Sequence, residues 1–311
     1  MIRLTALLLL VAMPAAADDG RADAITAYKS GDLTKAHQMF GRMAEQGDVE
    51  ALFYLGAIAH KDGMAVDAAR WFCRAAEAGH VASQHNCAVF SYRGLGTPLR
   101  KEDARRWFAD AASRGHLGSA ASLGAMLLEG EGGPEDAKAG LAWLGWAAAA
   151  GQPQALFALA NAYELGRGVA RDPKAASDYF RRAAIAGHAE AENAIGTFHL
   201  YGTHGLKTDA TEAARWFRRA ADRHSPAAAY NLATLLWNGV GVAKDPIAAY
   251  RWFATAGLYG DDAMINRVTG VLFQLEEQMS AADLEKAQMA VPDWENRLFR
   301  PQATIELLSE P

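Results

Sequence analysis

Histidine and cysteine are the residue types in this chain whose chemistry could support a metal centre or a nucleophile. The chain has nine histidines and two cysteines among its 311 residues. His199 and His204 flank one predicted loop, but no cysteine or carboxylate accompanies them at the spacing of a metal-ligand set. We therefore expect no metal site and no cofactor.

Three other histidines recur at equivalent places, each directly after a glycine. They are His80, His116 and His188. We predict that each closes a helix, because a cation or a ring donor there complements exposed carbonyl groups and the negative end of the helix dipole.

Sequence motifs of catalysis are absent. The chain contains no S-x-x-K, G-x-S-x-G or H-E-x-x-H motif and no phosphate-binding loop. Two acid pairs, Glu129 with Glu131 and Asp261 with Asp262, lie in predicted loops without a basic or nucleophilic neighbour. A hydrolase needs a nucleophile or paired acids that converge in one cleft. Because the sequence shows neither, we predict that the chain is not an enzyme.

The two cysteines, Cys73 and Cys87, each lie seven residues from a predicted turn near residue 80. In an antiparallel helix pair, residues equally far from the turn lie at the same height, so this spacing favours a disulfide. Closing the loop in this way would add about 3 kcal/mol to the stability. The alternative is two buried free thiols, because Cys87 takes a place that leucine usually holds in other parts of the chain.

All these residues belong to a pattern that repeats, mostly every 36 or 37 residues. Each copy has a small residue in the middle of a predicted first helix, namely Gly56, Ala88, Gly124, Ala160, Gly196 and Ala233. Apolar and small residues before it share one helix face. Since glycine inside a helix costs about 1 kcal/mol relative to alanine, we expect a neighbouring helix to approach closely at this position.

The ends of the predicted helices are also marked in each copy. Six residues after the small position a glycine ends the first helix: Gly94, Gly130, Gly166, Gly202 and Gly239. Asp-Pro pairs at 172–173 and 245–246 predict the start of the second helix. The second helix carries aromatic residues such as Trp107 and Phe108.

In these features, residues 51–260 resemble the Sel-1-like repeat, a relative of the tetratricopeptide repeat. The resemblance implies an all-α fold, a right-handed superhelical α-solenoid of stacked antiparallel helix pairs with a concave inner face. Elementary reasoning agrees, because short loops make neighbouring helices antiparallel and each pair can bury its apolar face only against the next pair.

We expect the chain to have four parts. These are a cleaved signal peptide over 1–17, a divergent helix pair over 18–48, six repeats over 49–261, and a helical cap and tail over 262–311. In the last part, residues 266–278 predict one helix, Ser280 predicts the cap of another, and Pro292 predicts its end. Residues 294–311 predict a packed turn followed by a loose tail.

The first residues predict export. Arg3 precedes ten apolar residues, Leu4–Met13, and Ala15 to Ala17 form a cleavage site before Asp18. An uncleaved anchor is the alternative, but ten apolar residues are short for spanning a bilayer. We expect a protein that is not membrane-embedded, in the periplasm or released, where oxidising conditions permit disulfides. The net charge of −5 disfavours nucleic acid as a partner.

The resemblance also implies where a partner would bind. In tetratricopeptide-like arrays the inner groove is lined by first-helix residues three before, one after and four after the small position. The candidates here are Phe53, His85, Tyr92, Phe157, Asn161, Asn193, Tyr230, Thr234 and Trp237. Large aromatic side chains with adaptable amides suit a peptide-binding groove. The alternative is that half of them pack between repeats.

Exported members of this family act as adaptors, and some restrain the outer part of a membrane sensor kinase. The resemblance therefore implies a monomeric, non-enzymatic adaptor of the bacterial cell envelope that holds a peptide or protein partner in its groove. Two alternatives remain open. One is an envelope hydrolase acting on cell-wall or β-lactam substrates, and the other is a secreted factor that binds a host protein.

Overall fold

The computed structural model describes residues 16–289, and in this range the chain forms α-helices joined by short loops, with no strand. The all-α fold predicted from the sequence is confirmed. The chain divides into two compact units at residues 100 and 101, which we describe separately. The first unit contains α1 (Ala16–Ser30), α2 (Leu33–Glu45), α3 (Val49–Lys61), α4 (Ala65–Glu77) and α5 (Val81–Arg93).

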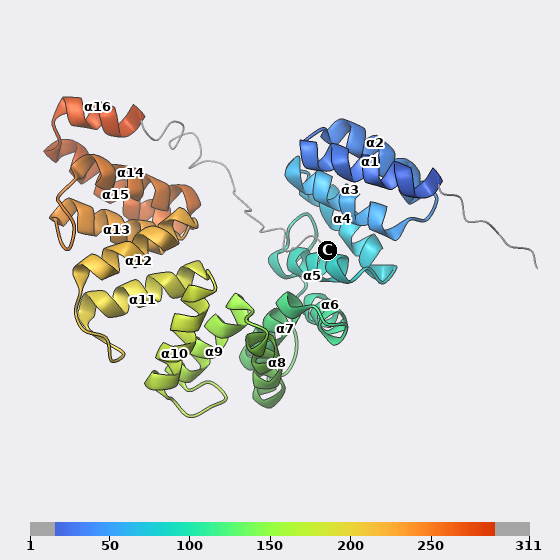
Figure 1. Ribbon diagram of the computed structural model, residues 1–311, viewed down its shortest axis with the longest axis horizontal. Coiled ribbons are helices and arrows are strands. Elements are labelled where there is room, and N and C mark those ends of the chain that lie inside the picture. The colour runs from blue at the N-terminus through green and yellow to red at the C-terminus, as the bar shows by residue number, and fades with distance from the viewer. Residues whose placement is uncertain (1–15, 290–311) are drawn as a thin grey trace, which may run out of the picture. The chain divides into compact units, whose positions relative to one another are not determined.

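The second unit holds the remaining helices. These are α6 (Lys101–Ser113), α7 (Leu117–Glu129), α8 (Ala137–Ala149), α9 (Pro153–Leu165), α10 (Pro173–Ile185), α11 (Ala189–Tyr201), α12 (Ala210–Asp222), α13 (Pro226–Asn238), α14 (Pro246–Tyr259), α15 (Asp262–Gln278) and α16 (Ala281–Met289). From α6 to α15 each helix packs against the next, as Figure 1 shows. The result is a solenoid of stacked antiparallel helix pairs, in which each pair contributes a first and a second helix.

In three first helices the small residue is a glycine, Gly56, Gly124 or Gly196, that faces a large residue of the second helix. A Cβ atom added to Gly56 would lie 2.7 Å from the ring of Phe72, and one added to Gly196 would lie 2.7 Å from the ring of Phe217. Real Cβ atoms do not come this close to neighbouring heavy atoms. The close helix approach predicted from the sequence is therefore confirmed, and it explains why glycine is tolerated inside these helices.

The predicted helix ends are confirmed as well. Five first helices end at a glycine in the left-handed conformation, with φ between 66° and 70°: Gly94, Gly130, Gly166, Gly202 and Gly239. Asp172 and Asp245 accept hydrogen bonds from backbone N–H groups at the starts of α10 and α14. These are local interactions between neighbours in the sequence, so they could be anticipated from residue types alone.

The prediction for the recurring histidines is wrong. The rings of His80, His116 and His188 do not complement the carbonyl groups of the preceding helix, because each ring caps the N-terminus of the following helix. Their backbone N–H groups donate to the preceding helix, at the carbonyls of Ala75, Ala111 and Ala183. In each case Nδ1 accepts a backbone N–H from three residues further on, at 3.2, 3.0 and 3.3 Å. An accepting nitrogen carries no proton, so the ring acts as an acceptor and not as a cation.

A signal for this role was present in the sequence. In other copies the same position holds Asp48, Gln152 or Ser225, and each of them accepts a backbone N–H at the start of a first helix. The property that these side chains share with histidine is the capacity to accept a hydrogen bond. Burial lowers the pKa of His116, and it lowers the pKa of His188 from 6.5 to about 4. Both shifts favour the neutral, accepting ring.

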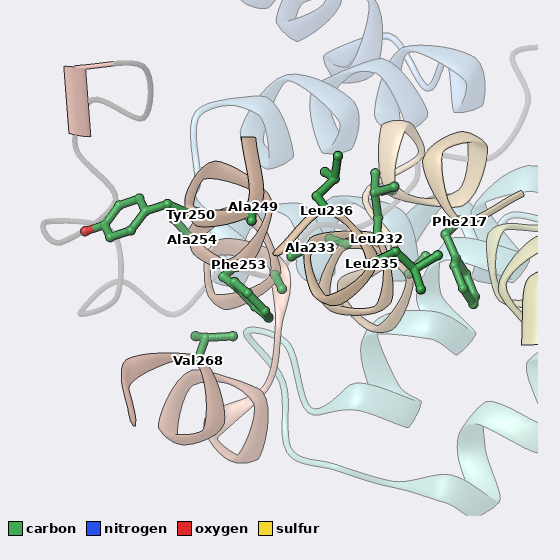
Figure 2. Packing of buried hydrophobic residues seen from close by; sticks show 14 of the residues in the cluster. Phe217, Leu232, Ala233, Leu235, Leu236, Ala249, Tyr250, Phe253, Ala254 and Val268 are labelled. Atoms are coloured by element: carbon green, nitrogen blue, oxygen red, sulfur yellow. The ribbon is translucent and has the colours of Figure 1, made fainter. Parts of the chain in front are cut away.

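Alanine and large apolar side chains alternate in the core between the helix layers. Figure 2 shows this core near the C-terminal end, where Phe217 of α12, Leu232 of α13 and Phe253 of α14 lie among alanines. Val268 of α15 faces Phe253 and continues the same core. Each fully buried large side chain contributes about 1.5–3 kcal/mol, and alanine lets the helices approach closely.

The two cysteines form a disulfide, as predicted. Cys73 of α4 and Cys87 of α5 are bonded, with their Cα atoms 4.9 Å apart. The bond joins consecutive helices of the first unit, so it ties the second helix of one repeat to the first helix of the next.

The C-terminal helices differ slightly from the prediction. α15 begins at Asp262, four residues before the predicted start at Asn266, because Asp261 caps it by accepting the N–H of Met264. The cap at Ser280 is confirmed, since its Oγ accepts the N–H of Asp283. Most of the predicted signal peptide, Pro292 and the tail over 294–311 lie outside the described residues. Within residues 16–289, no helix has the length and apolar character needed to cross a membrane.

Candidate partner-binding site

The structure buries two of the nine predicted groove residues. Phe53 of α3 is 7% exposed and packs against the rings of Tyr54, Phe72 and His80. His85 of α5 is 3% exposed. Their assignment to an open groove is corrected here, because a side chain enclosed by its own protein offers no surface to a partner. Tyr92, also on α5, is partly exposed and is the remaining candidate in the first unit.

In the second unit, two predicted residues line the same hollow. An open cavity of about 500 Å³ lies between α7 and α9, and Phe157 and Asn161 are part of its wall. The full lining consists of Ala121, Ser122, Ala125, Leu128, Glu129, Gln154, Phe157, Ala158, Asn161, Ala162, Leu165, Arg167 and His188. We call this the α7–α9 pocket.

The α7–α9 pocket exists because small residues face one another across the two helices. Four of its lining residues are alanines, and most of the lining surface is apolar. Phe157 is held in place by stacking on His188, with ring centroids 4.3 Å apart, and by an edge contact with Phe180 at 5.8 Å. Leu165 is 57% exposed at the open side. Such a hollow accepts an apolar side chain from another molecule.

Polar groups accompany this apolar surface. The Oε1 atom of Gln154 is buried and has no hydrogen-bond partner among the described residues, and the amide of Asn161 is partly exposed. Arg167 and Glu129 form an ion pair at the edge of the pocket. The acid that the sequence analysis noted in a loop, Glu129, is therefore engaged with a cation and is not part of an acid pair.

The other predicted residues lie on α11 and α13. Asn193 accepts a hydrogen bond of 2.9 Å from Asn231, which the sequence analysis did not single out. The hydroxyl of Thr234 donates to the carbonyl of Tyr230 at 2.9 Å, within its own helix. The structure thus links Asn193 to α13 through an amide pair, and recurrence of asparagine on first helices was the signal that could have found Asn231.

The two large aromatic residues of α13 are half-buried. Tyr230 packs against Phe253, with centroids 5.1 Å apart, and Arg267 lies over its ring. Trp237 carries Lys244 over its ring at 5.3 Å. Both side chains pack on the core of the last repeats. Each therefore has one face at the surface and one face in the interior. The first agrees with a place in a groove, and the second agrees with the alternative that these residues pack between repeats.

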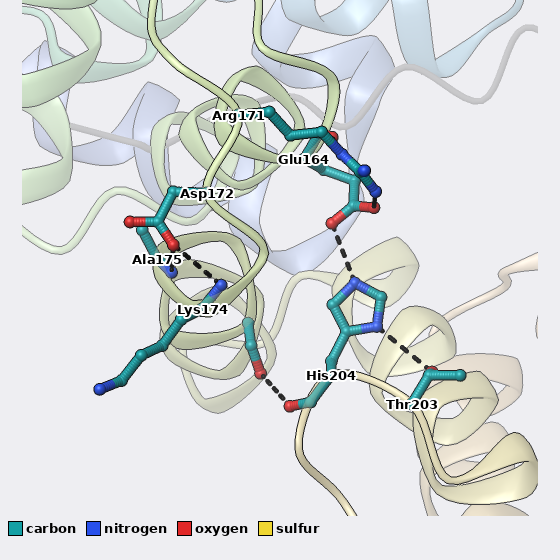
Figure 3. A network of polar contacts seen from close by, with 8 residues as sticks. Glu164, Arg171, Asp172, Lys174, Ala175, Thr203 and His204 are labelled. Atoms are coloured by element: carbon teal, nitrogen blue, oxygen red, sulfur yellow. Dashed lines mark hydrogen bonds and ion pairs between the residues drawn. The ribbon is translucent and has the colours of Figure 1, made fainter.

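Two carboxylates of first helices in this unit, Glu192 and Glu164, are paired with cations. Glu192 of α11 is fully buried and contacts Arg219 at 2.8 Å and Arg223 at 3.4 Å. Glu164 contacts His204 at 2.9 Å and Arg171 at 3.4 Å, as Figure 3 shows. Burial alone would raise the pKa of Glu164, but the hydrogen bond and charge of His204, together with Arg171, outweigh burial and lower it.

Glu192 and Glu164 are therefore held in ion pairs. Across residues 16–289, no group of three or more histidine, cysteine, aspartate or glutamate side chains could hold a metal ion. The α7–α9 pocket combines an apolar floor, an aromatic wall and two amides. This arrangement can bind an extended chain through one inserted side chain and hydrogen bonds to its backbone.

The fold defines the class of protein, which is a helical-repeat solenoid. The sequence profile of the Sel1 repeat matches residues 27–48, 49–80, 81–116, 118–152, 153–188, 189–225 and 226–258. The chain therefore belongs to the Sel1 repeat family. Proteins of this family are generally non-catalytic modules of protein interaction.

One solved structure supports the fold. A Sel1 repeat protein from Oxalobacter formigenes is 23% identical, with a TM-score of 0.55 over 76% of this chain and 96% of that chain. A protective antigen with an SLR fold, present in uropathogenic Escherichia coli strains, is 24% identical, with a TM-score of 0.49 over 94% of this chain and 74% of that chain. No curated protein matches the sequence.

Proposed function

We propose that this protein is a monomeric, non-enzymatic adaptor of the bacterial cell envelope that binds a peptide or a protein partner on its first helices. The observation that carries the proposal is the α7–α9 pocket, an apolar hollow with an aromatic wall and nearby amides. In its more specific form, the proposal is that the protein regulates a membrane sensor by binding this partner.

The partner inserts an apolar side chain into the α7–α9 pocket. The four alanines leave room for it, and Phe157 forms one wall. Burying an apolar side chain of leucine or phenylalanine size is worth about 1.5–3 kcal/mol. Gln154 and Asn161 then bind the backbone of the partner, because a peptide entering this hollow brings N–H and C=O groups that need partners.

The binding surface continues over the neighbouring first helices. Asn193 on α11 and the exposed faces of Tyr230, Thr234 and Trp237 on α13 belong to it. Half-buried aromatic side chains lose little freedom on binding, so they suit such a surface. Tyr92 of the first unit stays a candidate, whereas Phe53 and His85 are left out because they are buried.

Affinity capture tests this proposal. The mature chain, residues 18–311, is immobilised and exposed to an envelope extract of its source, and retained proteins are identified by mass spectrometry. Two variants act on the pocket in opposite ways, since Phe157→Ala removes a wall and Ala158→Trp fills the hollow. Tyr201→Ala is the matched control, because Tyr201 is 69% exposed and is not part of the pocket.

We expect a partner that the wild type and Tyr201→Ala retain and that both pocket variants lose. Circular dichroism establishes that each variant is helical. Equal retention by all four proteins would place the binding surface elsewhere. Capture of no envelope protein would contradict the adaptor proposal itself.

Location in the envelope rests on two features. One is the export signal predicted over residues 1–17, and the other is the disulfide between Cys73 and Cys87, which persists in oxidising compartments. Fractionation of cells, with N-terminal sequencing of the protein, tests this part. We expect a chain that begins at Asp18 outside the cytoplasm, and a full-length chain in the cytoplasm would contradict it.

A further inference from the structure

One loop of the second unit departs from the pattern of its neighbours. Two residues after the glycine that ends a first helix, four copies have a second glycine, with φ between 61° and 70°: Gly96, Gly132, Gly168 and Gly241. A Cβ atom on Gly241 would lie 2.3 Å from the backbone of Ala210, so this loop presses against the start of the preceding second helix. Only glycine permits such contact.

In the copy formed by α11 and α12, the same position holds His204. Its φ is 56°, a left-handed conformation that non-glycine residues adopt at a cost of about 1 kcal/mol. The loop is also longer by one residue, because Asp209 comes seven residues after Gly202, whereas Asp172 comes six residues after Gly166.

His204 ties this loop to the neighbouring helices. Its ring stacks on Phe198, with centroids 3.7 Å apart, and Nε2 contacts Glu164 at 2.9 Å. Its carbonyl oxygen accepts a hydrogen bond of 3.3 Å from Ser177 of α10, as Figure 3 shows. The loop is therefore tied to α9, α10 and α11 by separate contacts.

A cavity of about 610 Å³ lies beside this loop, lined by residues of α10, α11, the loop and α12. Its apolar walls include Ile195, Leu206 and Trp216. Arg219 lies 4.5 Å from the Trp216 ring and helps to hold the indole. The cavity faces the second helices α10 and α12, so it is separate from the α7–α9 pocket. Its volume lies within the usual range for small-molecule sites, about 300–1,000 Å³.

The polar residues around this cavity carry an uncompensated positive charge. Arg181 is paired with Asp178 at 2.8 Å, but Lys174 has no ion-pair partner among residues 16–289. The Nδ1 atom of His199 is buried without a hydrogen-bond partner. Apolar walls with one free cation at the edge fit a ligand that has a flat apolar body and one negative charge.

We propose that this cavity binds a small aromatic carboxylate. The aromatic ring lies against Trp216 between Ile195 and Leu206, and the carboxylate contacts the ammonium group of Lys174. An inorganic anion would leave the apolar walls unused, and a neutral aromatic molecule would leave Lys174 without a counter-charge. The site does not depend on the partner-binding proposal, because the two involve different residues and different helix layers.

Titration with benzoate, followed by methyl NMR of isoleucine-labelled protein, tests this site. Ile195 is the reporter, because its methyl group belongs to the cavity wall. We expect its signal to shift on addition of benzoate, and to shift much less with the neutral isostere benzamide or with acetate. An unshifted Ile195 signal at millimolar benzoate, or equal shifts with benzamide, would overturn the proposal.

Two variants and one control sharpen the test. Lys174→Met should raise the benzoate dissociation constant about fivefold, as expected for an ion pair near the surface. Lys138→Met is the matched control, because Lys138 holds the equivalent place on α8 and is not part of this cavity. His204→Gly should abolish the Ile195 shift, since it removes the contacts with Glu164 and Phe198. Equal affinity in wild type and Lys174→Met would also refute carboxylate recognition.

Discussion

Acidification should destabilise the helix that His188 caps. The neutral ring accepts the N–H of Ala191 at 3.3 Å, and burial lowers the pKa of His188 from 6.5 to about 4. A protonated ring would turn a donor toward this N–H and place a positive charge at the positive end of α11. The folded protein therefore resists protonation of this group, whereas the unfolded chain does not.

The direction and size of the effect follow from this difference. Above pH 6.5 the stabilising contribution is fully present, and it is lost as the pH falls from 6.5 through 4. The two pKa values differ by 6.5 − 4, or about 2.5, and a tenfold change in proton affinity is worth about 1.4 kcal/mol. The loss therefore approaches about 3 kcal/mol.

The matched variant is His188→Gln, because Gln152 caps α9 at the equivalent position by accepting an N–H through its Oε1. At pH 7 the free energy of unfolding of the variant should lie within about 1 kcal/mol of that of the wild type, because one helix cap replaces another. At pH 4 it should have lost about 3 kcal/mol less than the wild type, since it has no ring to protonate.

Urea denaturation of both proteins at pH 7, 5.5 and 4, followed by far-ultraviolet circular dichroism, measures the two free energies of unfolding. All other titrating groups are common to the two proteins and cancel in the difference. If wild type and His188→Gln lose the same free energy between pH 7 and pH 4, the neutral cap does not control this stability and the reasoning is wrong.

Three further outcomes follow from the packing. Arg219→Ala should destabilise the protein by about 1.5–3 kcal/mol, because the fully buried Glu192 loses one of its two cations and keeps only Arg223, and Glu192→Leu in the same chain should restore much of this in urea denaturation. Gly241→Ala should lower the midpoint of thermal unfolding far more than Gly205→Ala. Both glycines have a positive φ, but only a Cβ atom on Gly241 would meet backbone atoms, at 2.3 Å. Equal shifts of the two midpoints would contradict this close contact. Reduction of the disulfide should cost about 3 kcal/mol, measured by denaturation with and without reductant, and an unchanged midpoint would show that the bond does not constrain the unfolded chain.

Partner-site residues were harder to predict than helix ends. The sequence placed Phe53 and Phe157 at equivalent positions, yet Phe53 is 7% exposed and Phe157 lines an open pocket. Both rings contact the equivalent phenylalanine of the second helix, Phe72 or Phe180. The difference comes from the next residue along the chain, because Tyr54 packs on Phe53 whereas Ala158 follows Phe157 and leaves the pocket open. The exposure of a side chain at a repeated position depends on the side chains that pack around it. The repeat pattern itself does not specify those side chains.

The histidines show the same limit at shorter range. Each of them lies between two helices, and the prediction placed its ring at the end of the preceding helix. Asp48, Gln152 and Ser225 at the same position of other copies indicate the start of the following helix. Only the structure places Nδ1 of His188 within 3.3 Å of a backbone N–H of α11. The start of α15, four residues before the predicted one, has a local cause, because Asp261 caps the helix by accepting the N–H of Met264.

The sequence by itself determined the repeat period, the all-α class and the glycine and aspartate helix ends, and it favoured the disulfide. These features depend on backbone conformation and on hydrogen bonds within a few residues, or on distances along one antiparallel helix pair. The tertiary structure alone decided which aromatic residues are buried, which carboxylates meet a cation, and where cavities lie. Those outcomes depend on how side chains from successive repeats fill the space between helices, and small changes such as His204 in place of glycine alter that filling locally.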